Sequence, residues 1–270
     1  MPSQHAEETC AGNRFAFGEN WSRFLEVLDD ERIRQAEQSL CAMLEVTSLE
    51  GKRFLDVGAG SGLFSLAARN LGAQVHSFDY DPQSVACTAE LRRRYASGDS
   101  HWTVEEGSVL DREYLAGLGR FDVVYAWGVL HHTGNMYAAF ANVVDCLAPE
   151  GRLFLAVYND QGWISRYWGL VKRAYNRSRV AATLLATVHV PYLFGARWLV
   201  RKLSGRGPAP RGMSLWHDTW DWLGGYPFEV ARPEAVVEFF RDRGLVLEKL
   251  TTCGRRMGCN EFLFCRRDAP

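Results

Sequence analysis

The chain of 270 residues is long enough for one α/β domain with an insertion, and it can bury a sizeable core. Apolar residues make up 47% of it and charged residues 23%, as in ordinary globular proteins, and the net charge of −1 gives no electrostatic reason to expect a nucleic-acid partner. Local basic clusters at 92–94 and 197–206 are expected to be solvated helix faces.

The cysteines and the first residues bear on the compartment. The seven cysteines are odd in number, and no two of them have CxxC spacing. We therefore expect reduced thiols rather than a disulfide framework or a zinc site, and no metal requirement. The first ten residues contain no apolar run of the kind that signal peptides have, so the cytoplasm is the expected location.

Apolar runs of strand length alternate with helical patterns through the first 160 residues. Strands are expected at 53–57, 73–79, 101–107, 121–128 and 152–158, and helices at 63–72, 82–96 and 135–151. This alternation predicts a parallel sheet that is covered by helices on both faces. This alternation of strands and helices stops at about residue 160, and two helices are expected at 162–176 and 180–204. It resumes with a helix at 232–244 and a hairpin of strands at 245–252 and 260–266.

These patterns divide the chain into four parts. We expect a helical N-terminal arm or lid at 1–50, an α/β core at 51–160, a helical insertion over the substrate at 161–230, and a helix and hairpin that complete the sheet at 231–270. The stretch 180–200 contains His189, Pro191 and Arg197, and its uncharged run is near the lower length limit for crossing a bilayer. A buried lid or a homodimer contact is the preferred interpretation, interfacial association with a membrane is the alternative, and a transmembrane segment is not expected.

The most informative feature is a glycine-rich turn between the first strand and the first helix of the core. Gly58, Gly60 and Gly62 fall within five positions, and Asp79 ends the next strand. Glycines allow close approach of the backbone to a ligand, the helix N-terminus offers free N–H groups, and a carboxylate can bind both hydroxyls of a ribose. The spacing differs from the G-x-G-x-x-G dinucleotide fingerprint, and Asp56 precedes it, so a dinucleotide oxidoreductase is disfavoured.

The pattern resembles motif I of class I S-adenosylmethionine (SAM)-dependent methyltransferases, whose form is close to D-x-G-x-G-x-G. "SFDYDP" (77–82), "EEGSVLD" (105–111) and "FDVVYAWGVLHHTGN" (121–135) resemble later motifs of that family in the right order. "YAWGVLHHTGN" also looks similar to methylases related to ubiquinone biosynthesis. The resemblance covers about 50–160 and 230–266. It implies a doubly wound, mostly parallel seven-stranded sheet with an antiparallel last strand, SAM as cofactor and S-adenosylhomocysteine as product. The cofactor site that it implies consists of Asp56, Gly58, Ala59, Gly60, Gly62, Asp79, Tyr80, Ser108, Val109 and Trp127.

The acceptor is expected beyond the carboxyl ends of the strands, where open parallel sheets bind ligands. SAM is already activated, so positioning supplies much of the acceleration, and a base is needed only for a protonated nucleophile. His131 and His132 are the base candidates, with His131 preferred, although one of the two could instead pack against the next helix. Asp160 and His217 are the next candidates, and Asp218 and Asp221 could orient an imidazole or cap a helix. The expected aromatic substrate pocket consists of Trp21, Tyr158, Asn159, Trp216, His217 and Tyr226.

Several activities are compatible with these motifs. Methyl transfer to a small molecule is preferred. The alternative within the same fold is a lyase that cyclises SAM and releases methylthioadenosine, which would need a closed pocket with no room for an acceptor. Methylation of RNA or protein is less favoured, because the charge is balanced and no binding domain is appended. A SAM-binding scaffold without catalysis is the remaining interpretation.

Overall fold

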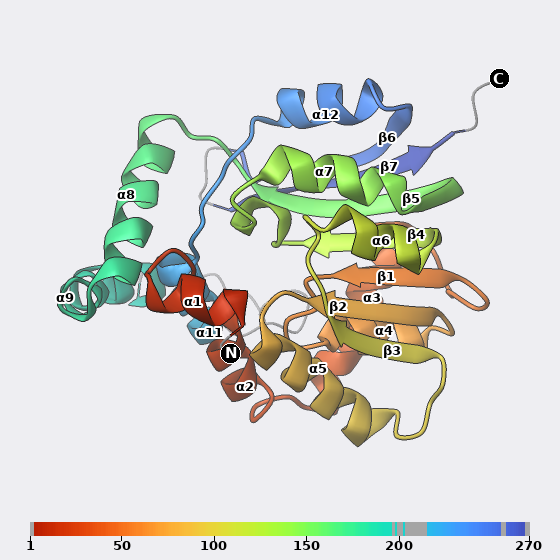
Figure 1. The fold of residues 1–270 in the computed structure, drawn as a ribbon, viewed down its shortest axis with the longest axis horizontal. Helices are drawn as coiled ribbons and strands as arrows, with labels where there is room; N and C mark the ends of the chain where they lie inside the picture. Colours follow the sequence, from red (N-terminus) through yellow and green to blue (C-terminus); the bar gives the residue numbers. More distant parts are fainter. Residues whose placement is uncertain (1–2, 196–197, 199–201, 203–214, 255–257, 268–270) are drawn as a thin grey trace.

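The computed structural model describes residues 3–195, 198, 202, 215–254 and 258–267. Its centre is a seven-stranded sheet with the order β3-β2-β1-β4-β5-β7-β6 (Figure 1). Four neighbouring pairs are parallel, and only β7 runs antiparallel to its two neighbours, β5 and β6. The predicted fold class is thereby confirmed. The strands are β1 (Arg53–Val57), β2 (Gln74–Asp79), β3 (Trp102–Glu106), β4 (Phe121–Trp127), β5 (Leu147–Tyr158), β6 (Leu245–Thr251) and β7 (Cys259–Arg266).

Helices cover both faces of this sheet. One face packs against α6 (Arg112–Leu118), α7 (Met136–Asp145) and α12 (Pro233–Arg241), and the other against α3 (Asp30–Leu44), α4 (Leu63–Asn70) and α5 (Pro82–Tyr95) (Figure 1). Because both faces are covered, the central strands β1 and β4 are buried at consecutive positions rather than at alternating ones. Several helices begin with a side-chain cap: α5, for example, begins with Asp81 as N-cap and Pro82 in its first turn.

Both predicted boundaries at the junction of α7 and β5 are wrong, and α6 was not predicted at all. The helix expected at 135–151 ends at Asp145, and residues from Leu147 onward already belong to β5. Pro149 offers no N–H group and Glu150 has a φ of 56°, so this part of the strand pairs irregularly with the start of β4. The short α6 spans only two turns, which gives too few apolar positions for a periodic pattern.

The remaining helices lie at the carboxyl ends of the parallel strands (Figure 1). They are α1 (Gln4–Cys10), α2 (Phe17–Phe24), the 3-10 turn η1 (Leu130–His132), α8 (Trp163–Arg177), α9 (Arg179–Val190), the π-helical turn η2 (Pro191–Gly195) and α11 (Leu215–Gly224). Instead of the single helix expected at 180–204, α9 gives way to η2 at Pro191, which lacks the N–H that a continuing α-helix needs. Within the described ranges, no helix combines the length and the apolar character needed to cross a bilayer.

Candidate functional site

A cavity of about 620 Å³ lies at the carboxyl ends of β1 to β5, beneath α1, α2 and α11. Its volume is typical of small-molecule sites, which span roughly 300–1,000 Å³. The glycine turn, the ends of β2 and β3, and the segment after β4 all contribute to its wall. Of the predicted site residues, those that line the cavity are Trp21, Asp56, Gly58, Ala59, Gly60, Asp79, Tyr80, Ser108, Val109, Trp127, His132 and Tyr158.

The glycine turn is held by the end of β2. The N–H groups of Gly58 and Ala59 donate to the carbonyl of Phe78 at 2.9 and 3.1 Å, and the N–H of Gly60 donates to Asp79 Oδ2 at 2.9 Å. Asp79 Oδ1 accepts a further hydrogen bond from the N–H of residue 81 at 2.9 Å. Burial raises the pKa of Asp79 to about 6. The carboxylate therefore fixes the turn and at the same time faces the cavity.

The turn leaves no room for side chains. Gly58 and Gly60 have φ values of 71° and 58°, in the left-handed region that favours glycine. A Cβ at Gly58 would lie 2.5 Å from Val129 Cγ1, and one at Gly60 would lie 2.9 Å from Trp21 Nε1. Bare backbone is therefore presented to the cavity, as a ligand in close contact with the turn requires. Gly62 does not line the cavity; it precedes α4 and donates its N–H to Ala59.

Asp56 lies beneath the turn in a buried chain of polar groups. Its Oδ2 accepts a hydrogen bond from Ser65 at 2.5 Å, the hydroxyls of Ser65 and Ser77 are 2.7 Å apart, and Trp102 Nε1 donates to Ser77 at 2.8 Å. Burial raises the pKa of Asp56 to about 7. Because the chain connects β1, α4, β2 and β3, it ties the base of the turn to the sheet.

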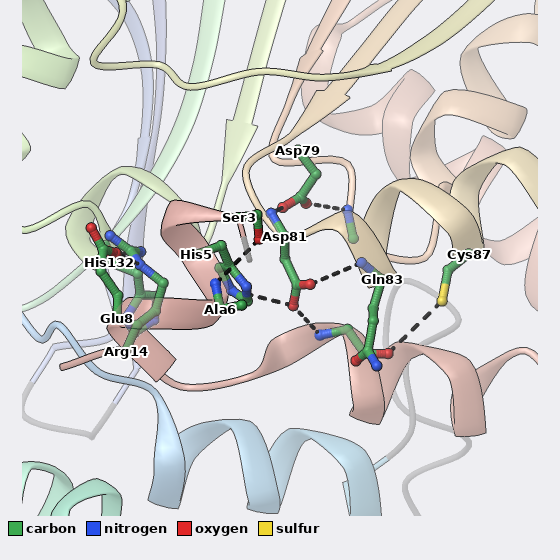
Figure 2. A network of polar contacts seen from close by, with 12 residues as sticks. Ser3, His5, Ala6, Glu8, Arg14, Asp79, Asp81, Gln83, Cys87 and His132 are labelled. Atoms are coloured by element: carbon green, nitrogen blue, oxygen red, sulfur yellow. Dashed lines mark hydrogen bonds and ion pairs between the residues drawn. The ribbon is translucent and has the colours of Figure 1, made fainter. Parts of the chain in front are cut away.

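The N-terminal arm is fastened over the cavity by Asp81, which the sequence had shown only as part of a motif (Figure 2). Asp81 Oδ2 accepts a hydrogen bond from the N–H of Gly18 at 2.7 Å and lies 3.6 Å from His5 Nε2, while Oδ1 accepts from the N–H of Gln83 at 2.9 Å. One carboxylate thus joins α1, α2 and α5. The sequence placed Asp81 in the motif 77–82, but nothing in it indicated the contacts to the arm.

Arg14 forms a second link between the arm and the core. Its Nε lies 2.6 Å from Glu8 Oε2, its Nη1 donates to the carbonyl of His132 at 2.9 Å, and its guanidinium lies 4.8 Å from the ring centre of Tyr80. Tyr80 in turn donates to Glu8 at 3.3 Å. The arm therefore folds back over the cavity.

The two adjacent histidines have different surroundings. His132 lines the cavity, and its Nδ1 lies 2.6 Å from the carbonyl of Pro227; since a carbonyl only accepts, Nδ1 carries the proton and Nε2 is the acceptor. Burial, and then the Lys172 cation, lower the pKa of His132 to about 3. His131 is fully buried beside Tyr158, outside the cavity wall, and burial holds its pKa well below the ordinary value. The structure thus brings His132 to the cavity, rather than the preferred His131.

Acidic side chains of α11 reach the cavity from the insertion. Asp218 and Asp221 line it, and Asn20 Nδ2 donates to Asp221 Oδ1 at 2.9 Å. Burial, and then the nearby Asp218, raise the pKa of Asp221 to about 8. Lys172 of α8 is completely buried behind them and donates to the carbonyl of Trp222; burial lowers its pKa to about 7. Lys172 was not predicted as a buried residue of the site, although the sequence places this lysine among the apolar positions of a predicted helix.

Several residues predicted for the site lie elsewhere. Asp160 accepts a hydrogen bond from the N–H of Gly162 at the start of α8, and the amide of Asn159 contacts Asn260. Neither these two nor Trp216 and Tyr226 form part of the cavity wall. Trp216 is 46% exposed and packs against Phe194 and Trp220. The side chain of His217 lies outside the described part of the chain.

Acidic side chains outnumber basic ones in the cavity wall. Among its described lining residues, seven carboxyl groups stand against a single arginine, Arg14. They are Glu8, Asp56, Asp79, Asp81, Asp111, Asp218 and Asp221. Asp56 and Asp221, with pKa values raised to about 7 and 8, carry less than a full negative charge at neutral pH. The remaining negative charge favours a ligand that carries positive charge.

Comparison with known proteins gives the family. A family model described as a methyltransferase domain matches residues 29–201. The ubiquinone biosynthesis O-methyltransferase of Xanthomonas campestris pv. campestris is 36% identical over 112 residues, which cover 42% of this chain and 45% of that protein. The tRNA U34 carboxymethyltransferase of Pseudomonas fluorescens is 36% identical over 117 residues, which cover 43% of this chain and 35% of that protein. The chain therefore matches less than half the length of either relative.

Solved structures of low sequence identity show the same fold. The magnesium protoporphyrin IX methyltransferase from Synechocystis, with bound SAH, has a TM-score of 0.55 at 17% identity and covers 92% of this chain and 93% of its own. The 1,6-didemethyltoxoflavin-N1-methyltransferase of Burkholderia thailandensis has a TM-score of 0.54 at 18% identity and covers 99% and 93%. The family model matches more than half of the chain, and both the predicted fold and the predicted family are confirmed. The chain belongs to the class I SAM-dependent methyltransferase family.

Proposed function

We propose that this protein transfers a methyl group from SAM to a small-molecule acceptor inside the cavity. The observation that supports this most is the continuity of the cavity, which runs from the glycine turn and Asp79 to His132, Tyr158 and Asp221. One end has the features of a cofactor site, and the other has groups that can bind and deprotonate an acceptor. When bound, SAM supplies a methyl group on a positively charged sulfur that is already activated for displacement.

The residues at the first end fit such a cofactor. The bare backbone of Gly58 and Gly60 allows close approach, and Asp79 can accept hydrogen bonds from ribose hydroxyls while it holds the turn. The excess of acidic groups favours the sulfonium of the cofactor over the neutral thioether of its product, which assists release after transfer. Aromatic rings that include Trp21 and Trp127 exclude water from the same space.

At the acceptor end we propose different roles for two groups. With a pKa raised to about 8, Asp221 is the better general base, because the best catalytic pKa lies near the working pH. His132, with a pKa of about 3, stays neutral, and its Nε2 orients the acceptor by accepting a hydrogen bond. Tyr158 and Trp222 form the apolar wall beside them. The acidic surroundings favour an uncharged or cationic acceptor.

We propose further that the arm (1–50) and the insertion (161–230) act together as a lid. The contact of Asp221 with Asn20 joins α11 to α2, and Asp81 joins α2 to the core. A lid of this kind holds the acceptor near the sulfonium and keeps water out, which is where positioning contributes to the rate.

The proposal is tested by incubating the purified chain with SAM and a panel of phenols, catechols, amines and transfer RNA, followed by mass spectrometry of the nucleoside products. S-adenosylhomocysteine that forms only with a small molecule supports it. Its formation only with transfer RNA contradicts the acceptor class. Methylthioadenosine without any acceptor supports the SAM-cyclising alternative instead.

A further inference from the structure

The insertion carries the most exposed apolar side chains of the described molecule. On α8, α9 and η2, six large apolar residues are 64–75% exposed and Tyr167 is 46% exposed, whereas outside residues 163–216 no described large apolar side chain exceeds 45%. Single exposed apolar side chains are normal, but a contiguous patch marks an interaction site. We name this patch the α8–α9 apolar face. It consists of Trp163, Tyr167, Leu170, Val180, Leu184, Val188 and Tyr192.

The spacing of these residues makes the face continuous along each helix. On α8 they are separated by four and three positions, and on α9 and η2 they recur every four, so each set lies on one side of its helix. Both helices already have another apolar side that faces the core: Trp168 and Val171 of α8 are buried with Trp222 and Leu223 of α11. A helix that is apolar on two sides is expected to have a partner on each of them.

Exposed basic residues lie on the same helices as this face. Between Asp160 and Asp218 the sequence has ten lysine and arginine residues and no acidic residue, against 21 basic and 32 acidic residues in the rest of the chain. Arg166, Arg173 and Arg177 of α8 are exposed next to the apolar residues. Within the described part of the chain, no carboxylate forms an ion pair with any of the three. The net charge of the whole protein is close to zero, but the segment between Asp160 and Asp218 is strongly basic.

We propose that the α8–α9 apolar face binds to the surface of an anionic lipid bilayer. Aromatic and aliphatic side chains at a membrane interface enter the headgroup region, and arginines beside them attract lipid phosphates. Nucleic acid would account for the arginines and aromatic rings, but not for the exposed Val180, Leu184 and Val188. A second copy of the chain would place this basic region against itself, with like charges in contact.

The position of the face links membrane binding to the cavity. The helices α8 and α9 lie beside the core, at some distance from the sheet (Figure 1). They contact α11, whose Asp221 and Trp222 line the cavity. No residue of the apolar face lines the cavity itself. A bilayer bound to this face would therefore lie one helix away from the acceptor end of the site.

The test is flotation of the full chain with vesicles of phosphatidylcholine alone or with about 30% phosphatidylglycerol, at about 0.1 M salt. We expect binding only to the anionic vesicles. The double variant Arg173→Glu/Arg177→Glu is expected to bind about 30-fold more weakly, since each basic side chain at such a surface contributes about fivefold. Leu184→Ser/Val188→Ser is expected to lose about tenfold or more, because these side chains no longer enter the interface.

Two exposed positions outside this face provide matched controls. Tyr95→Ser changes an aromatic side chain that is 44% exposed on α5, and Arg241→Glu reverses a charge on α12. Neither is expected to change vesicle binding, and all variants are expected to bind SAM as the wild type does, which also shows that they fold.

Three results would overturn the proposal. The first is a wild type that ignores both kinds of vesicle. The second is a dimer in sedimentation velocity that Leu184→Ser/Val188→Ser dissociates while vesicles are not bound, which would make the face a contact between copies. The third is a mobility shift of transfer RNA that Arg173→Glu/Arg177→Glu abolishes in the absence of vesicle binding.

Discussion

Asp79→Asn tests the link between the glycine turn and cofactor binding. The carboxylate accepts hydrogen bonds from the N–H groups of Gly60 and Asp81, each at 2.9 Å. An amide has one acceptor oxygen and one NH₂ group, so one of the two backbone donors would face another donor. Losing a hydrogen bond to a charged group costs about 1.5–3 kcal/mol, which corresponds to roughly 10- to 150-fold in Kd. We therefore expect the Kd for SAM to rise by a factor within this range.

Calorimetric titration of SAM into wild type and variant measures this change, with thermal unfolding followed in parallel. The matched control is Asp122→Asn at the start of β4, at the end of the strands away from the cavity, where Asp122 accepts a hydrogen bond from the N–H of Arg53 at 2.9 Å. It should lower stability by a similar amount and leave SAM affinity unchanged. Because the pKa of Asp79 is about 6, the wild type should also lose SAM affinity as pH falls through 6. If Asp79→Asn binds SAM within twofold of the control and shows the same pH profile, the reasoning is refuted.

Three further predictions follow from the same geometry. Gly60→Ala should weaken SAM binding at least fivefold, because its φ of 58° is unfavourable for alanine by about 1–2 kcal/mol and its Cβ would meet Trp21, whereas Gly51→Ala, with a φ of 70° and open space, should affect stability only. Asp221→Asn should abolish the rise in the methyl-transfer rate that the wild type shows as pH increases through about 8; a variant profile that still rises there would exclude Asp221 as the base. Lys172 has a pKa of about 7 when folded and about 10.4 when unfolded, so the folded state binds fewer protons between these values and stability should increase with pH across that window. Lys172→Met should remove this increase in urea unfolding, and an unchanged pH dependence would show that the lysine is not the group responsible.

The parts of the site near the glycine turn were predictable because they are local in sequence. Gly58, Gly60 and Asp79 belong to a strand-turn-helix-strand unit whose geometry is set within about 25 residues, and the structure brings them to one cavity. The mostly parallel sheet was also predictable, since alternating strands and helices leave few topologies open.

The rest of the site depends on contacts between distant segments. Asp81 and Gly18 are 63 positions apart, and Asn20 and Asp221 are 201 apart, so no periodic pattern connects them. The sequence also does not show which of two adjacent histidines enters the cavity. That choice depends on η1, whose turn orients His132 toward Pro227 and buries His131 under Tyr158.

The most direct test of the central claim is a pair of calorimetric titrations of the wild-type chain, one with SAM and one with NAD. A cavity built by Gly58, Gly60 and Asp79 for SAM predicts one binding site per chain for SAM and no measurable binding of NAD. Binding of NAD without binding of SAM would contradict the account, because the glycine turn would then serve a dinucleotide.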